Sequence, residues 1–212
     1  MQLRPYQEEA ANAVFREWEH NRSTLLVMGT GLGKTVVFSE ITKRLVEEGK
    51  RVLIIAHQGQ LLQQAQTKLY NHAQIPSKIE KAKDFASMND QVVIGSIQTL
   101  AQDNRLHRFS SDHFDTIIID ECHHAMAKSY QKVIDYFENA KLLGVTATPN
   151  RGDSQSIMST FQSTAFQFGI KEGVEAGYLS PLCIRTCQLP IDVSQVAIQA
   201  GDYQAGALGN VL

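Results

Sequence analysis

The sequence predicts a doubly wound α/β fold in which a mainly parallel β-sheet is sandwiched between helices. Three observations predict it. Short runs of Val, Ile and Leu recur along the chain, segments with apolar residues at helical spacing alternate with them, and clusters of glycines or acidic residues follow two of the runs. Apolar runs without polar alternation indicate strands that are buried on both faces, which is typical of parallel sheets covered by helices.

The predicted elements follow one another in a regular order. Behind Pro5, apolar residues at helical spacing predict a helix over residues 7–20. The run at 24–28 predicts a strand that ends in glycines, and a helix with apolar positions from Val36 to Val46 follows it. The same order repeats with a strand at 51–56 and a helix around 61–69, and further buried strands are predicted at 92–94, 116–119 and 142–145.

We expect residues 1–170 to form one domain and residues 171–212 to form a segment that leaves it. No repeat or low-complexity tract interrupts the first part. After Gly169, glycines and prolines break the pattern, and one strand candidate runs from Leu182 to Leu189.

Composition restricts the class of protein without identifying it. The chain has 212 residues, with 20 Lys and Arg against 22 Asp and Glu, so its net charge of −2 neither indicates nor excludes a nucleic-acid partner. Three cysteines without zinc-ligand spacing indicate reduced thiols. The sequence shows neither a signal peptide nor an apolar run of about 18 residues, so we expect a cytoplasmic protein with no membrane partner.

A glycine-rich motif between the first strand and the second helix predicts a phosphate-binding loop. Its glycines let backbone amides turn inward at a helix N-terminus, where the helix dipole also favours an anion. The lysine supplies a positive charge to the β- and γ-phosphates, and the threonine hydroxyl is a suitable Mg²⁺ ligand. The motif predicts ATP and Mg²⁺ as cofactors, and it consists of Gly29, Thr30, Gly31, Leu32, Gly33, Lys34 and Thr35.

Two carboxylates follow the buried strand at 116–119. A strand that ends in acidic residues delivers them to the carboxyl edge of the sheet, where ligands of α/β proteins bind. Asp120 suits the shell of Mg²⁺, and Glu121 can orient or deprotonate an attacking water. Together with Lys34 they are the predicted catalytic residues, with Thr35 and Asp120 as the metal ligands. Two weaker alternatives remain: a solvated acidic loop, and a zinc site at Cys122, His123 and His124.

The D-E-C-H string at 120–123 resembles motif II of superfamily-two DEAD/DEAH-box helicases. Other strings resemble the family's motifs in the family's order: L-R-P-Y-Q at 3–7, A-H-Q-G-Q at 56–60, G-S-I-Q-T at 95–99 and T-A-T-P at 146–149. The chain departs from the strict phosphate-loop pattern only in having Met28 at its first position. The whole resembles the N-terminal RecA-like domain of such a helicase, a P-loop NTPase, and within the superfamily it is similar to RadD-like proteins and restriction-enzyme motor subunits.

This resemblance implies roles for further residues. Arg4 would stack on adenine, and the Gln7 amide would read the base edge, because it offers both a donor and an acceptor. The nucleic-acid backbone would be held by Gln58, Gly59, Ser96, Gln98 and Thr99, although Gln58-Gly59 lacks the cation that relatives often carry there. For Ser96 and Thr99, helix capping is an alternative that is compatible with phosphate binding. Coupling of hydrolysis to domain movement would depend on His123, Thr146 and Thr148.

The resemblance also implies an ATP-dependent helicase or translocase whose track is nucleic acid, DNA more than RNA. Such motors need a second RecA-like domain with arginine fingers, so we expect residues 171–212 to lead toward that domain and the chain by itself to hydrolyse ATP weakly. We expect it to be monomeric. The alternatives are the motor part of a restriction-modification enzyme, a stand-alone P-loop NTPase switch, and a non-catalytic nucleic-acid-binding module.

Overall fold

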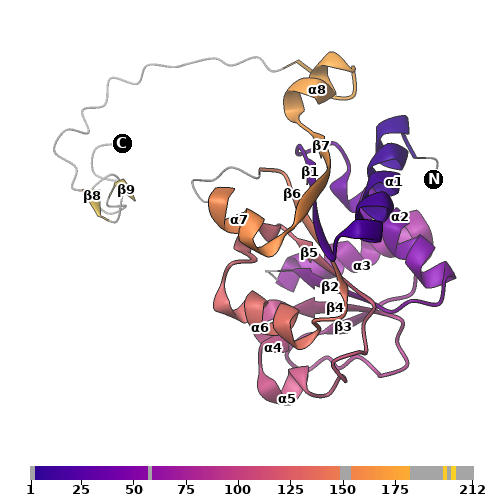
Figure 1. Ribbon diagram of the computed structural model, residues 1–212, viewed down its shortest axis with the longest axis vertical. Helices are drawn as coiled ribbons and strands as arrows, with labels where there is room; N and C mark the ends of the chain where they lie inside the picture. Colours follow the sequence, from indigo (N-terminus) through magenta and orange to yellow (C-terminus); the bar gives the residue numbers. More distant parts are fainter. Residues whose placement is uncertain (1–2, 57–58, 149–153, 182–197, 200–201, 204–212) are drawn as a thin grey trace. The chain divides into compact units, whose positions relative to one another are not determined.

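The computed structural model describes residues 3–56, 59–148, 154–181, 198–199 and 202–203. Contacts divide the chain into two compact units, Met1–Ser180 and Pro181–Leu212. The first unit holds the β-sheet and all the helices of the described residues (Figure 1).

The first unit is built on a seven-stranded sheet in the order β3-β4-β2-β5-β6-β1-β7. Every pairing within it is parallel, which confirms the predicted parallel sheet. The strands are β1 (Ser23–Met28), β2 (Val52–Ala56), β3 (Lys78–Glu80), β4 (Val92–Ser96), β5 (Thr116–Asp120), β6 (Lys141–Thr146) and β7 (Ser163–Phe168).

Helices cover both faces of this sheet, as a doubly wound fold requires. One face packs against α1 (Pro5–His20), α2 (Lys34–Glu47) and α3 (Gly59–Ala73) (Figure 1). The other packs against α4 (Ile97–Leu100), α5 (Asp103–Leu106), α6 (Lys128–Tyr136) and α7 (Ser154–Thr160). A 3₁₀ turn, η1 (Cys122–His124), follows β5, and α8 (Ile170–Glu175) follows β7.

The hydrophobic core has two layers because successive side chains of a strand point to opposite faces. In β1, Leu26 packs toward α1 and α2, whereas Leu25 and Val27 pack toward the opposite layer. Ile118 and Ile117 of β5 divide in the same way. The continuous apolar runs of the sequence therefore supply both layers at once.

The pattern of apolar runs misses two strands, and both lie at the edges of the sheet. β3 has three residues, of which Lys78 is exposed. In β7, with the sequence S-T-A-F-Q-F, every residue is partly or fully exposed. An edge strand is covered on fewer sides, so its sequence need not be continuously apolar. The strand candidate at 182–189 lies outside the described residues.

The second unit contains, among its described residues, the strands β8 (Ile198–Gln199) and β9 (Asp202–Tyr203), which pair antiparallel. The first unit extends to Ser180 and so includes α8, whereas the sequence pattern predicts a boundary at residue 170. That division stays a prediction. In the part of the chain that the structure describes, no helix is long and apolar enough to cross a membrane.

Candidate nucleotide-binding site

The glycine-rich loop lies between the end of β1 and the start of α2, as predicted. Gly31 has a φ of 87° and Gly33 a φ of 83°, backbone conformations that residues with a Cβ rarely adopt. A Cβ on Gly33 would also lie 2.6 Å from Nε2 of Gln7. The loop therefore needs glycine at these positions both for its turn and for its close approach to the start of α1.

Lys34 and Thr35 open α2 directly behind this loop. The Lys34 ammonium donates a hydrogen bond to the carbonyl of Met28 at 3.3 Å, so it reaches back across the loop toward the end of β1. Thr35 and Asp120 line one small cavity of about 40 Å³, together with Gln64 and Lys68 of α3. A hydroxyl and a carboxylate on one cavity are the hard oxygen donors that Mg²⁺ prefers, and Mg²⁺ keeps several waters besides.

The two carboxylates lie at the carboxyl edge of β5. Burial raises the pKa of Asp120, the negative charge of Glu121 raises it further, and the cations Lys34 and Lys68 act in the opposite sense. A bound divalent cation would favour the ionised carboxylate. Glu121 has a φ of 52°, which is uncommon for a residue with a side chain, and its amide donates to Oδ1 of Asp120 at 3.1 Å.

The predicted coupling residues follow the carboxylates and the neighbouring strand β6. Nδ1 of His123 lies 3.4 Å from Oε2 of Glu121, an ion pair when the imidazole is protonated. Thr146, at the end of β6, is fully buried, and its hydroxyl accepts a hydrogen bond from the amide of Thr148 at 3.3 Å. Cys122 is buried in the hydrophobic layer that contains α6, where burial raises the pKa of its thiol.

The N-terminal residues Arg4 and Gln7 are brought to the phosphate loop. Gln7 is buried, its Oε1 accepts from the amide of Arg4 at 3.0 Å, and its Nε2 donates to the carbonyl of Leu32 at 3.2 Å. The hydroxyl of Tyr6 donates to the same carbonyl at 2.8 Å. The start of α1 is thus tied directly to the loop by two donors on one carbonyl.

Aromatic residues with no role predicted from the sequence pack beside Arg4 and Gln7 at the start of α1. The ring of Tyr6 stacks on Phe168 at 4.8 Å and meets the ring of Tyr178 at 4.6 Å. The Arg4 guanidinium lies 5.3 Å from the centroid of the Tyr178 ring. Tyr6 stands within the quoted L-R-P-Y-Q string, but no sequence signal indicates that Tyr178, so distant along the chain, joins it.

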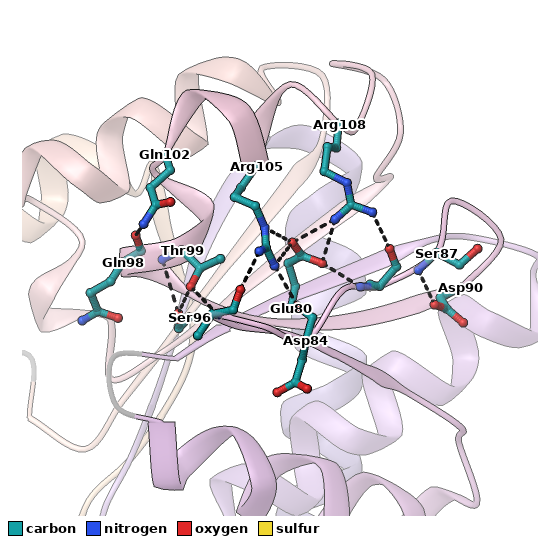
Figure 2. A network of polar contacts seen from close by, with 12 residues as sticks. Glu80, Asp84, Ser87, Asp90, Ser96, Gln98, Thr99, Gln102, Arg105 and Arg108 are labelled. Atoms are coloured by element: carbon teal, nitrogen blue, oxygen red, sulfur yellow. Dashed lines mark hydrogen bonds and ion pairs between the residues drawn. The ribbon is translucent and has the colours of Figure 1, made fainter.

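The predicted nucleic-acid contacts lie at the carboxyl edges of β2 and β4. Ser96 caps α4: its hydroxyl accepts from the Thr99 amide at 3.3 Å and donates to the Thr99 hydroxyl at 2.9 Å (Figure 2). Both side chains are buried, so the capping alternative describes their contacts here. Gln98 is exposed, Gly59 begins α3, and Gln58 lies outside the described residues.

Residues 1–151 match the family described as type III restriction enzyme, res subunit. The chain belongs to this family. Among curated relatives of the res-subunit domain, the putative ATP-dependent helicase IRC3 of Saccharomyces cerevisiae is 28% identical over 226 residues, which cover 99% of this chain and 32% of that protein. The type I restriction enzyme EcoAI endonuclease subunit of Escherichia coli is 29% identical over 207 residues, 90% of this chain and 25% of that protein.

Solved structures share the fold of this res-subunit domain. The UvsW helicase of bacteriophage T4 has a TM-score of 0.63 at 21% identity. The match covers 79% of this chain and 60% of the UvsW chain. The ATP-dependent type ISP restriction-modification enzyme LlaBIII, bound to DNA, has a TM-score of 0.66 at 20% identity and covers 84% of this chain and 16% of its own.

These likenesses confirm the predicted RecA-like fold and the resemblance to the motor domains of helicases and restriction enzymes. The chain spans a quarter to a third of the length of the two curated relatives. The predicted roles of single residues stay predictions.

Proposed function

We propose that the chain is the ATP-binding half of a nucleic-acid motor, which binds ATP with Mg²⁺ and couples hydrolysis to movement when a second RecA-like domain joins it. One observation carries the proposal: Asp120, which is distant in sequence from Lys34 and Thr35, converges with them at one carboxyl edge of the sheet. Thr35 and Asp120 line the same small cavity. Family membership and the helicase relatives support the same function.

The phosphates would be held by the backbone amides of residues 29–35, at the N-terminus of α2, and by the Lys34 ammonium. Thr35 and Asp120 would hold Mg²⁺, whose charge offsets the negative charge that develops on the phosphates. Glu121 would orient or deprotonate the attacking water. His123, which lies beside Glu121, and the threonines of β6 would report the state of the nucleotide to the second domain.

Adenine would be bound by Arg4 and Gln7. Since the Gln7 amide already holds Arg4 and Leu32, reading the base requires it to exchange or share these hydrogen bonds. We propose DNA rather than RNA as the track, a cytoplasmic location and a monomeric chain. Structurally similar proteins that were solved bound to DNA support the first of these.

The motor part of a restriction-modification enzyme is the second candidate, favoured by the family and by the EcoAI relative. In that case the same ATP site would drive translocation for a nuclease carried elsewhere. The two candidates share their chemistry on this chain and differ in what the motor is joined to.

Nucleotide titration tests the proposal. The unmodified chain should bind ATP in the presence of Mg²⁺. Lys34→Ala should abolish measurable binding, because Lys34 is the lysine of the phosphate loop itself, whereas Lys68 lies on α3. Lys43→Ala is the control, since Lys43 lies on the same helix and, within the described residues, forms its ion pair with Glu47 at the surface. Unchanged ATP affinity in Lys34→Ala, or no ATP binding by the unmodified chain, would contradict the proposal.

A further inference from the structure

A short turn after β3 lies beside the segment Ser96–Thr99 at the carboxyl edge of the sheet. The turn is closed by two backbone hydrogen bonds between Lys81 and Asp84, at 3.1 and 2.7 Å, and Ala82 within it has a φ of 46°. The Ala82 amide donates to the Thr99 hydroxyl at 3.2 Å. The turn is therefore fixed to the edge where the nucleic-acid contacts are predicted.

A buried ion cluster holds this turn in place (Figure 2). The Glu80 carboxylate is fully buried and accepts from Arg105 at 2.5 Å, from Arg108 at 3.1 Å and from the Ala86 amide at 2.6 Å. The Arg105 guanidinium also donates to the carbonyls of Ala82 and Asp84, each at 2.7 Å. Because a buried charge is costly unless it is fully paired, this arrangement fixes the backbone of the turn in one geometry.

The turn presents two lysines to solvent. Lys83 is exposed and Lys81 is half-buried, and neither ammonium forms an ion pair or hydrogen bond within the part of the chain that the structure describes. Asp84, at the end of the turn, is also exposed. The turn and the ion cluster behind it bring together four cationic side chains and two carboxylates: Lys81, Lys83, Arg105 and Arg108 with Glu80 and Asp84.

This local excess of positive charge occurs in a chain whose net charge is −2. Two arginines on one carboxylate already leave a surplus cation inside the cluster, and two unpaired lysines on a rigid turn add to it. Like charges held together without partners repel one another, so an arrangement of this kind is favoured when an anion binds it.

We propose that the Lys81–Lys83 turn binds the phosphodiester backbone of the nucleic-acid track, next to Gln98. The inference rests on the proposed function and adds to it the cations that the segment Gln58-Gly59 lacks. Lysine ammonium groups contact phosphates as point charges and read no base, so the contact is independent of sequence and weakens as salt concentration rises.

The experiment compares three double variants of the full chain. Lys81→Ala with Lys83→Ala removes the charges, whereas Lys81→Arg with Lys83→Arg keeps them. The matched control, Lys43→Ala with Lys50→Ala, removes two surface charges whose partners are Glu47 and Asp115. Fluorescence anisotropy measures affinity for a short single-stranded DNA, the corresponding duplex and a single-stranded RNA over a range of salt, and ATP binding is measured in parallel.

For the alanine pair we expect a loss of roughly five- to tenfold in affinity per lysine near 0.1 M salt, and a log–log salt slope that is less steep by about 0.7 to 0.9 per lysine. ATP affinity should not change. The arginine pair and the control pair should bind nucleic acid like the unmodified chain.

If the alanine pair bound like the control while the unmodified chain bound nucleic acid, the turn would not be a contact and the proposed function would stand. If the unmodified chain bound ATP but no nucleic acid at low salt, both the turn and the track-binding role of this domain would be overturned. If the arginine pair lost affinity as the alanine pair does, charge would not be the cause and the proposal would fail.

Discussion

Gln7 serves two parts of the candidate site with one side chain. Its amide oxygen is bound by the Arg4 backbone, and its amide nitrogen donates to Leu32 in the phosphate loop. Tyr6 donates to the same carbonyl, so removing either donor leaves the other in place. The Tyr6 hydroxyl also accepts from Gln7 at 3.4 Å and from Arg4 at 3.5 Å. A substitution at Gln7 therefore needs comparison with one at Tyr6, which keeps the amide and changes the same hydrogen-bond network.

Gln7→Ala should reduce the preference for ATP over GTP by on the order of 1–3 kcal/mol, because polar groups of the base would be left unpaired. Tyr6→Phe removes the other hydrogen bond to Leu32 but keeps the ring and the Gln7 amide, so it should lower the affinities for both nucleotides with a smaller change in the preference between them. Calorimetric titration of both nucleotides measures the difference. Equal affinity of the unmodified chain for ATP and GTP would contradict the adenine role of Gln7.

The adjacent carboxylates should respond differently to neutral replacements. In a chain extended by its second domain, Glu121→Gln should still bind ATP and Mg²⁺ but lose turnover by on the order of 10² or more, since an amide cannot act as a base. Asp120→Asn should weaken the Mg²⁺-dependent part of ATP binding. Titrations with and without Mg²⁺, together with steady-state turnover, separate the two. Identical binding by both variants would show that the carboxylates do not divide these roles.

At the scale of elements, α8 and the residues Tyr178 and Leu179 that follow it pack against the phosphate loop and the start of α1. A Cβ on Gly29 would lie 2.9 Å from Ile170, and one on Gly31 would lie 3.1 Å from Leu179. Tyr178 packs on Tyr6 in the same place. The end of the first unit thus packs against both the phosphate loop and the start of α1.

Truncation tests this support. A chain that ends at Ser180 should keep the stability and ATP affinity of the first unit, whereas one that ends at Gly169 should lose both. The shorter chain loses the apolar contacts of Ile170, Tyr178 and Leu179. Because these side chains are only partly buried, each contributes less than the about 1.5–3 kcal/mol of a fully buried one. Urea unfolding and ATP titration of the two chains provide the measurement. Equal stability would place the end of the folded unit near residue 170, as the sequence analysis does.

At the scale of the whole molecule, the residues proposed to bind the phosphates, the metal, the water and the base all lie in one RecA-like domain. The arginine fingers expected of such motors would come from a second RecA-like domain. In residues 170–212 the sequence contains one arginine, Arg185, which has no recognised motif around it. In such motors two RecA-like domains would close on the nucleotide, and one domain cannot perform this step by itself.

The 212-residue chain should therefore hydrolyse ATP at a rate near background. Adding nucleic acid should not increase this rate. A version extended by a second domain of about 150–200 residues should gain stimulated turnover. The arginine finger alone contributes about 10³ to 10⁵ in rate in related NTPases. Steady-state ATP turnover with and without DNA and RNA measures this. Strong stimulated turnover by the chain alone would favour a self-sufficient NTPase.

The sequence by itself determined the parallel α/β fold and the location of the phosphate loop and the acidic pair. Buried strands must be apolar on both faces, and a tight anion-binding turn needs glycines. The local sequence therefore predicts both features. Edge strands and short helices need neither continuous apolar runs nor glycines at fixed positions. The sequence pattern therefore did not predict β3, β7 and α8.

Only the tertiary structure decided which distant side chains meet. Tyr178 beside Tyr6, the Gln7 amide on Leu32, and Arg105 on both Glu80 and the Lys81–Asp84 turn each join segments that no local pattern relates. Their contacts arise because parallel strands bring their carboxyl ends to one edge of the sheet, so that loops far apart in the chain become neighbours there.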